Sequence, residues 1–348
     1  MLATQISSVT VRKPVTWPLD TVMAWKHLIG SAEPFLQDVS RCLAEQIQAF
    51  DSEIAVYARY ALTGQGKQLR PALVALSAGA TGKIHDSHVM AAVIIEMVHL
   101  ATLVHDDVID EAEIRRGRPT LAANWGNEIS VLLGDCLFAH SLKLAASFPT
   151  PEICRAVAAA TNTVCSGEIL QTQRRKKFEL SRAEYFKVLS MKTGELFALS
   201  CDLGAFLSGA VPAQRAALRH YGLALGTAYQ VYDDCLDLFG SEAKAGKSLG
   251  TDLAKGKMTL PMLWLFERAT ADEQTRLKLM IQDWDPASLP QVMELLQTHE
   301  AMDESRRAVH QYLQGARKAL HTLPESESRS SLSGVVDYLA QQTDALRS

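Results

Sequence analysis

One stretch of the sequence constrains the fold more than any other, because it places three aspartates inside a run with helical period. It extends from Glu96 to Gly117 and continues an apolar stripe with spacings of three or four: Val93, Met97, Leu100, Val104 and Val108. A polar stripe at the same spacing ends in Asp106 and Asp110. On a helix these carboxylates would lie about 6 Å apart along the axis, on one face, where like charges repel unless a cation is present. The stretch predicts a helix with one packed face and one cation-binding face.

The same pattern recurs later in the chain, at Asp233, Asp234 and Asp237. Its apolar stripe consists of Leu225, Ala228, Tyr232, Leu236 and Phe239. Two helices that face each other with such carboxylates could hold Mg²⁺, which takes one or two carboxylates and leaves its other positions to water and substrate phosphates. The alternative is a solvated acidic face on each helix. Two such clusters, both inside strongly apolar helices, favour the metal site.

The composition is that of a globular chain with ample material for a core: 348 residues, 47% hydrophobic and 21% charged. A formal net charge of −4 argues against a nucleic-acid partner. The six cysteines form no CxxC pair and are typical of buried thiols in a reducing cytoplasm. The most apolar run, 89–104, contains Glu96 and His99 and is too short to span a bilayer, and no secretory signal is present. We expect a cytoplasmic protein without a stable membrane anchor.

Helical periodicity extends over almost the whole chain. Residues 1–20 have no clear period and are expected to form a loose arm, whereas 21–348 predict a single domain. Helical patterns cover 21–62, with a break at 30–34, and resume at 71–80, 87–111, 127–147, 152–173 and 213–239, among others. Strand patterning is scarce, so the predicted fold class is all-α.

Basic residues gather beside the acidic clusters. Arg115 and Arg116 follow the first cluster, and a carboxylate and metal site next to guanidinium groups suits a diphosphate, although a structural ion-pairing role is the alternative. Lys67 and Arg70 precede a predicted helix start, which is either an anion site or a solvated helix end. The loop 240–261 carries further lysines but lacks the spacing and the preceding strand of a Walker A motif. The run 174–177 is interpreted as a solvated helix end.

Taken together, these motifs resemble the trans-isoprenyl (polyprenyl) diphosphate synthases, in particular their long-chain branch. The resemblance covers residues 40–345 and rests on GKQLRP, LVHDDVIDEAEIRRGRPT, GDCLFA, GEILQ, KTGELF, YQVYDDCLDLFG and GKSLGTDLAKGKMTLP, in the family's order. It implies a single-domain antiparallel helical bundle around a central cavity, usually a homodimer, with three Mg²⁺ ions between the aspartate motifs. The implied activity condenses isopentenyl diphosphate with an allylic diphosphate by ionisation, condensation and elimination.

The resemblance also implies roles for individual residues. The implied contacts to isopentenyl diphosphate are Lys67, Arg70, His99 and Arg116. The implied contacts to the allylic diphosphate are Arg115, Lys192, Thr193, Gln230, Lys247 and Lys257. The implied metal ligands are Asp106, Asp110 and Asp233. The catalytic set adds Asp107, Asp234, Asp237 and Lys192.

Product length is expected to depend on two positions just before the first aspartate. In the family a bulky residue there blocks the growing chain, whereas Ala101 and Thr102 are both small. We therefore expect a product longer than twenty carbons. Two other activities are alternatives to this one. A class I terpene cyclase needs only one substrate, which the apparent isopentenyl diphosphate set argues against. A non-catalytic or partner-dependent subunit of a heteromeric synthase would be marked by degenerate aspartate motifs, and here both are complete.

Overall fold

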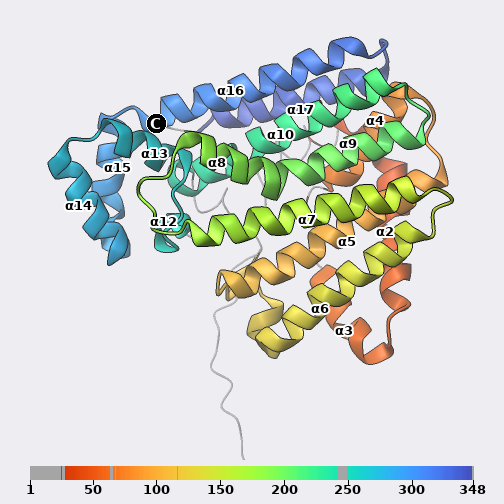
Figure 1. The fold of residues 1–348 in the computed structure, drawn as a ribbon, viewed down its shortest axis with the longest axis horizontal. Helices are drawn as coiled ribbons and strands as arrows, with labels where there is room; N and C mark the ends of the chain where they lie inside the picture. The colour runs from red at the N-terminus through yellow and green to blue at the C-terminus, as the bar shows by residue number, and fades with distance from the viewer. Residues whose placement is uncertain are drawn as a thin grey trace, which may run out of the picture.

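The protein is a bundle of long helices (Figure 1). The computed structural model describes residue 25 and residues 28–62, 66, 68–115, 117–240 and 249–346. The all-α fold class predicted from the helical periodicity is confirmed. The loose arm predicted for residues 1–20 lies outside the described residues.

The first half of the bundle contains a central helix and the helices packed around it. Its elements are η1 (Gly30–Ala32), α2 (Glu33–Gln48), α3 (Ser52–Leu62), α4 (Leu69–Thr81), α5 (Asp86–Ile109), β1 (Ile114–Arg115), β2 (Arg118–Pro119), α6 (Leu121–Ala146) and α7 (Pro151–Gln173). The two short strands pair antiparallel directly after the first aspartate cluster. The sequence pattern did not predict this ribbon.

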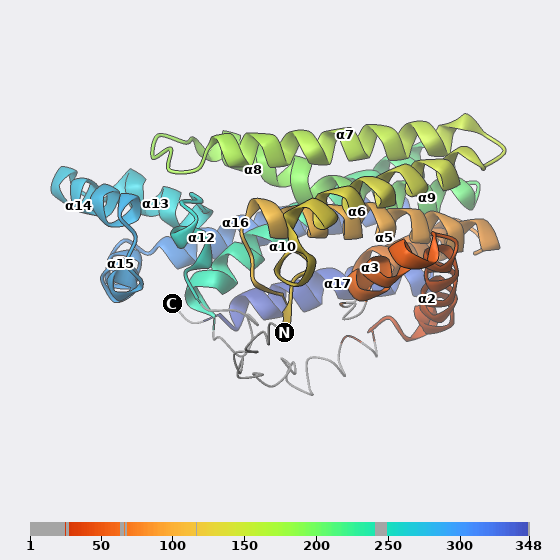
Figure 2. The same cartoon turned by 90° about the horizontal axis from the view of Figure 1, so that it is seen from below.

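The second half begins with a short helix that leads into a π-helical turn. Its elements are α8 (Arg182–Leu189), η2 (Ser190–Gly194), α9 (Glu195–Leu207), α10 (Pro212–Phe239), α12 (Thr251–Ala254), α13 (Leu260–Arg268), α14 (Ala271–Gln282), η3 (Pro286–Ser288), α15 (Leu289–Thr298), α16 (Ala301–Ala319), η4 (Leu320–Thr322) and α17 (Glu327–Asp344). In Figures 1 and 2, α14 and α15 project from one end of the bundle, beyond α13.

Local sequence signals set several helix boundaries. The Thr120 side chain accepts a hydrogen bond from the backbone of Ala123, so α6 begins earlier than position 127, where the periodicity placed it. Gly126, at φ 88°, then interrupts that helix near its start. The pattern 21–62 also divides at 49–51, a break that the periodicity missed, because Asp51 accepts a bond from the backbone of Glu53 and starts a new helix.

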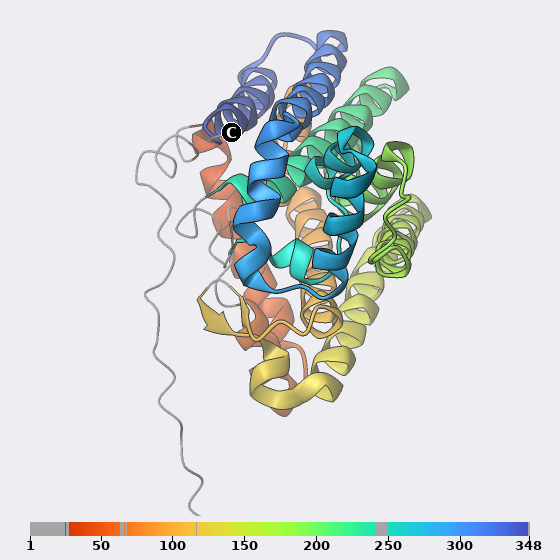
Figure 3. The ribbon, with the colours of Figure 1, turned by 90° about the vertical axis from the view of Figure 1, so that its left-hand side faces the viewer.

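The two aspartate-bearing helices belong to the core of the bundle. Seen end-on, α5 lies in the interior, where it packs against α2, α4, α6 and α9 (Figure 3). Its apolar stripe is buried at Val93, Met97 and Val104. Helix α10 packs against α9, α16 and η2. Because both helices are fixed by apolar packing, their carboxylates are carried on a rigid frame.

Two helices, α5 and α6, have the length and the apolar composition of a membrane span. The apolar window of α5 is 56% buried inside the bundle, as befits a core helix, whereas that of α6 is only 33% buried. Helix α6 therefore exposes apolar surface.

Candidate active site

The two aspartate clusters are linked through the π-helical turn η2. Lys192 Nζ lies 3.5 Å from Asp106 Oδ2 on α5. The adjacent Thr193 donates its hydroxyl to Gln230 Oε1 on α10, at 2.8 Å. Gln230 in turn donates to Asp234 Oδ1 at 3.0 Å. Residues from three distant parts of the sequence are thereby joined in one polar network.

Close backbone packing holds η2 in place. A Cβ atom on Gly167 of α7 would lie 2.8 Å from the backbone nitrogen of Lys192, and one on Gly226 of α10 would lie 2.8 Å from the Cα of Gly194. Only glycine permits approaches this close. Single π turns within helices often occur at functional sites, and this one carries both Lys192 and Thr193.

Asp110, the last residue of the first cluster, is surrounded by three cationic side chains. Its carboxylate lies 2.6 Å from Arg175 Nη2, 2.9 Å from Lys257 Nζ and 3.4 Å from Lys255 Nζ. Burial alone would raise the pKa of Asp110, but the lysine charges outweigh burial and hold its pKa at about 2. Asp252, 3.7 Å from Lys257, is a second carboxylate at this cluster. Cationic and acidic side chains are thus packed closely together here.

Two turns that are distant in sequence bring these cations together. The backbone nitrogen of Lys176 donates to the carbonyl of Gly256 at 2.7 Å, which joins the end of α7 to the loop before α13. Gly256 has φ 66°, a conformation that favours glycine. The interpretation of 174–177 as a solvated helix end was wrong for Arg175, which turns inward to Asp110. Arg174, in contrast, pairs with the exposed Glu184.

Asp106 shares Lys192 with two polar residues of α7 that the sequence analysis did not select. Lys192 forms an ion pair with Glu168 and donates a hydrogen bond to Gln171 Oε1 at 2.9 Å. Burial raises the pKa of Glu168, although the Lys192 charge opposes the rise. Burial lowers the pKa of Lys192, but Asp106 and Glu168 outweigh it and leave that pKa raised, so the ammonium stays charged. Glu168 and Gln171 both belong to the GEILQ motif, which is the sequence signal that could have identified them.

Asp107 faces away from this group and has its own cation. It accepts a hydrogen bond from Arg115 Nε at 2.7 Å. Burial raises the pKa of Asp107 despite the Arg115 charge. In this structure Arg115 is thus paired with Asp107 of the first cluster. Its contact with an allylic diphosphate stays a prediction.

Asp234 and Asp237 of the second cluster accept hydrogen bonds from uncharged donors of the described residues. Tyr185 donates its hydroxyl to Asp234 Oδ2 at 2.6 Å, and burial together with the Asp252 charge raises the pKa of Asp234 to about 7. Asp237 is fully buried and accepts bonds from the Thr251 hydroxyl at 2.6 Å and from the backbone of Asp252 at 3.0 Å. Tyr185 and Thr251 were not predicted from the sequence.

The remaining predicted residues make other contacts or lie outside the described part of the chain. The Arg70 guanidinium stands 5.1 Å from the centre of the Phe197 ring. Thr102 donates its hydroxyl to the His99 carbonyl at 2.7 Å, and Ala101 is fully buried. The predicted residues outside the described ones are Lys67, Arg116 and Lys247.

The donor set fits a hard cation such as Mg²⁺. Asp106 and Asp110 present carboxylate oxygens one turn apart, and Asp233 lies on α10 beyond the η2 link. Among the described residues no three carboxylate, imidazole or thiol groups are close enough to enclose a metal ion. Mg²⁺ does not need such an enclosure, because it binds through one or two carboxylates together with water and substrate phosphates.

Comparisons with known proteins identify the family of this chain. A family model described as polyprenyl synthetase matches residues 51–298. Octaprenyl diphosphate synthase of Haemophilus influenzae is 34% identical over 302 residues, covering 86% of this chain and 92% of that protein. Heptaprenyl diphosphate synthase component 2 of Bacillus subtilis is 35% identical over 316 residues, covering 89% and 90%.

Solved structures place the fold in the same group. A polyprenyl synthase from Caulobacter crescentus, complexed with calcium and isoprenyl diphosphate, superposes with a TM-score of 0.86 at 32% identity and covers 91% of this chain and 97% of its own. The chain belongs to the polyprenyl synthetase family and is an enzyme of the polyprenyl diphosphate synthase class.

Proposed function

We propose that this enzyme condenses isopentenyl diphosphate with an allylic diphosphate to make a trans-polyprenyl diphosphate, in a reaction that depends on Mg²⁺. The observation that carries the proposal is the cluster around Asp110, where Arg175, Lys255 and Lys257 stand beside the carboxylates of the first aspartate motif. Such a site attracts a strongly anionic ligand together with divalent cations. The relatives named octaprenyl and heptaprenyl diphosphate synthases support the choice of substrate.

In this reaction the protein must stabilise a leaving group. Heterolysis of the allylic carbon–oxygen bond leaves a carbocation and diphosphate, and the isopentenyl double bond then attacks the cation. Lys192, Lys257 and Arg175 would neutralise charge that grows on the departing diphosphate, which lowers the barrier more than it stabilises the bound substrate. The bound diphosphate would accept the proton lost in the final step. Buried apolar helices around the site would keep out water that would trap the carbocation.

Metal ions would add to this electrostatic stabilisation. Mg²⁺, when bound, polarises diphosphate oxygens as a Lewis acid. We propose that Asp106, Asp110 and Asp233 hold three such ions. The Caulobacter relative, which binds calcium together with isoprenyl diphosphate, supports a divalent cation at the site.

Substrate contacts follow the same proposal. Isopentenyl diphosphate would bind Arg70 and His99, with Lys67 and Arg116, and the allylic diphosphate would bind Thr193 and Gln230, with Arg115 and Lys247. Arg175 and Lys255 are added to the allylic set because they flank Asp110.

We propose a product longer than twenty carbons. Ala101 and Thr102 lie on α5 one turn before Asp106, and small side chains there leave room for the chain to grow. Replacing Ala101 by Phe is expected to shorten the product, whereas Ala101→Ser should leave its length unchanged. Sizing of the dephosphorylated products by chromatography checks this expectation. Identical product lengths from the Phe variant and the wild type would show that the chain takes another path.

A direct assay tests the activity itself. Purified protein would be incubated with Mg²⁺, radiolabelled isopentenyl diphosphate and farnesyl diphosphate. A product beyond twenty carbons, lost on chelation and in the Asp106→Ala variant, is expected. No incorporation with any allylic primer would favour a partner-dependent subunit, which the relative named component 2 makes the second candidate. Conversion of one allylic diphosphate without isopentenyl diphosphate would indicate a cyclase.

A homodimer through α6 is proposed on the basis of its exposed apolar side chains. Leu132 is 60% exposed and Val131 41%, on a helix whose apolar window is only 33% buried. Contiguous exposed apolar surface of this kind is typical of a subunit interface. Light scattering after gel filtration should give twice the chain mass for the wild type and a monomer for Leu132→Asp. A monomeric wild type would contradict the proposal.

A further inference from the structure

A cavity separate from the aspartate network lies between α8, α10, α13 and α16. Its volume is about 850 Å³, within the range of sites that hold small organic ligands. The described residues that line it include neither the aspartates of the two motifs nor Lys192. The cavity is thus distinct from the site proposed for catalysis.

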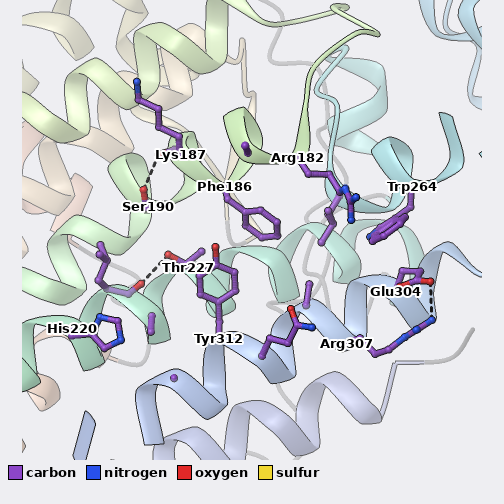
Figure 4. Close-up of a pocket in the computed structure, with 17 residues that line it drawn as sticks. Arg182, Phe186, Lys187, Ser190, His220, Thr227, Trp264, Glu304, Arg307 and Tyr312 are labelled. Carbon is purple, nitrogen blue, oxygen red and sulfur yellow. Dashed lines mark hydrogen bonds and ion pairs between the residues drawn. The ribbon is translucent and has the colours of Figure 1, made fainter. Parts of the chain in front are cut away.

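One part of the cavity wall is aromatic and aliphatic. The rings of Phe186 and Tyr312 face each other with 5.1 Å between their centroids (Figure 4). Leu223, Ala224 and Leu260 continue this apolar surface. An apolar chain bound here would be removed from water, which is the main source of affinity for such ligands.

One end of the cavity is cationic. Arg182 lies against the Trp264 ring, at 3.9 Å from its centre, and Arg268 lies 5.2 Å from the same ring. Arg307 is paired with Glu304 at 2.8 Å, and Glu304 is also bound by Arg268. Figure 4 shows Arg182 beside Trp264 and Arg307 beside Glu304.

The described residues that line the cavity carry more cationic than acidic groups: Arg182, Lys187 and Arg307 against Glu304, in a chain whose overall net charge is −4. Outside the lining, Arg182 is paired with Glu267 at 3.0 Å and Arg268 lies 3.9 Å from Glu300. The Arg182–Glu267 pair is 43% exposed on both sides, and pairs so exposed are weak. Arg182 contacts Glu267 through Nε, which leaves its terminal nitrogens to donate to another anion.

We propose that this cavity binds an amphipathic anion, an apolar chain that carries a phosphate or diphosphate group. The chain would lie against Phe186, Tyr312 and Leu223, and the phosphate would bind Arg182 and Arg307. Guanidinium groups suit phosphate because they donate paired hydrogen bonds. The apolar chain can be isoprenoid or acyl, since both present the same chemistry to these walls.

The occupant of the cavity would also touch elements that shape the catalytic network. Ser190 lines the cavity and is the first residue of η2, which carries Lys192. Thr227 lines it as well, and a Cβ on Gly194 of η2 would lie 3.1 Å from the Thr227 hydroxyl. The cavity and the catalytic network thus share one short segment of backbone.

Binding would be measured by calorimetry in EDTA, so that no metal-dependent diphosphate site contributes. The probes are farnesyl monophosphate, dodecyl phosphate and uncharged farnesol. At least one phosphate is expected to bind about tenfold more tightly than farnesol. The tighter of the two phosphates identifies the chain as isoprenoid or acyl. If neither binds, or if farnesol binds as tightly, the proposal is wrong.

Matched variants locate the binding. Gly315 lines the cavity, and a Cβ there would meet no atom within 4 Å, so a larger side chain can be added without backbone strain. Gly315→Phe should weaken phosphate binding at least about tenfold, whereas Gly315→Ala should change it less than about twofold. Arg182→Gln should weaken it by about tenfold and Lys318→Gln, on the same helix as Gly315 but outside the cavity, by less than twofold.

Retained synthase activity and an unchanged circular dichroism spectrum would show that the Gly315→Phe variant is folded. Equal affinity of Gly315→Phe and Gly315→Ala would overturn the proposal, because the probe would then bind elsewhere. Since the titration requires no turnover, its outcome is independent of whether the condensation reaction itself is observed.

Discussion

The two aspartate clusters have the same spacing in the sequence but are held by different kinds of partner. The first is held by charges: Arg115 binds Asp107, and three cations surround Asp110. In the second, uncharged donors of the described residues hold two carboxylates: Tyr185 and Gln230 bind Asp234, and Thr251 binds Asp237. The same aspartate motif can therefore be held either by ion pairs or by hydrogen bonds from uncharged groups.

The difference suggests a division of work between the clusters. Ion pairs at the first cluster can be exchanged for metal ions and diphosphate, since the same cations that neutralise Asp110 can turn to a phosphate. Hydrogen bonds at the second cluster fix the carboxylates of a buried helix in one orientation. The first cluster would thus respond to ligands, while the second would provide a rigid wall.

The largest expected effect comes from replacing a single carboxylate in either cluster. Asp106→Asn and Asp233→Asn should each lower kcat at saturating Mg²⁺ by about a thousandfold, because both would hold metal ions that stabilise the leaving group. Asp303→Asn on the exposed side of α16 serves as the control and should retain full activity. If Asp233→Asn kept more than a tenth of the activity, the second cluster would be structural only.

Removing an uncharged donor should affect stability rather than substrate binding. Tyr185→Phe leaves buried Asp234 with one hydrogen bond fewer and should lower the free energy of unfolding by about 1–3 kcal/mol. Urea denaturation in EDTA measures this change. Tyr57→Phe removes a hydroxyl outside both clusters and should have little effect. A stable Tyr185→Phe variant would mean that the second cluster is less rigid than its hydrogen bonds indicate.

Removing a cation from the first cluster should affect substrate binding rather than stability. Arg175→Gln should weaken the binding of diphosphate in the presence of Mg²⁺ by about tenfold, the loss of one charge-assisted contact. The neighbouring Arg174→Gln, which removes the same charge from a pair with exposed Glu184, should change it less than about twofold. Calorimetry with inorganic diphosphate compares the two. Equal affinities of the two variants for diphosphate would show that Arg175 serves only as a counter-ion of Asp110.

The smallest expected effect refines the contrast within the second cluster. Thr251→Val removes the hydroxyl that binds Asp237 and should cost about 1 kcal/mol of stability. Thr251→Ser keeps the hydroxyl and should cost less. If Thr251→Val unfolded at the same urea concentration as the wild type, the hydrogen bond to Asp237 would contribute no stability.

Much of the site was predictable because its residues lie in short, recognisable motifs. Lys192, Thr193 and Gln230 were selected from KTGELF and YQVYDDCLDLFG, and the structure joins them by direct contacts. Arg175 could not be selected in this way. It reaches Asp110 only because the turn after α7 is bound to the backbone of Gly256, and local periodicity carries no information about such a contact.

Helical periodicity by itself determined that this protein is all-α and that two of its helices carry aspartates on one face. Such features depend on spacings of three and four residues, which the order of the amino acids contains directly. Only the tertiary structure decided which partner each aspartate received. Asp110 and Asp237 occupy equivalent places in their motifs, yet among the described residues Asp110 meets lysines and an arginine, whereas Asp237 accepts hydrogen bonds from a hydroxyl and a backbone amide. The reason is that these partners come from distant segments, whose meeting depends on the packing of the whole bundle.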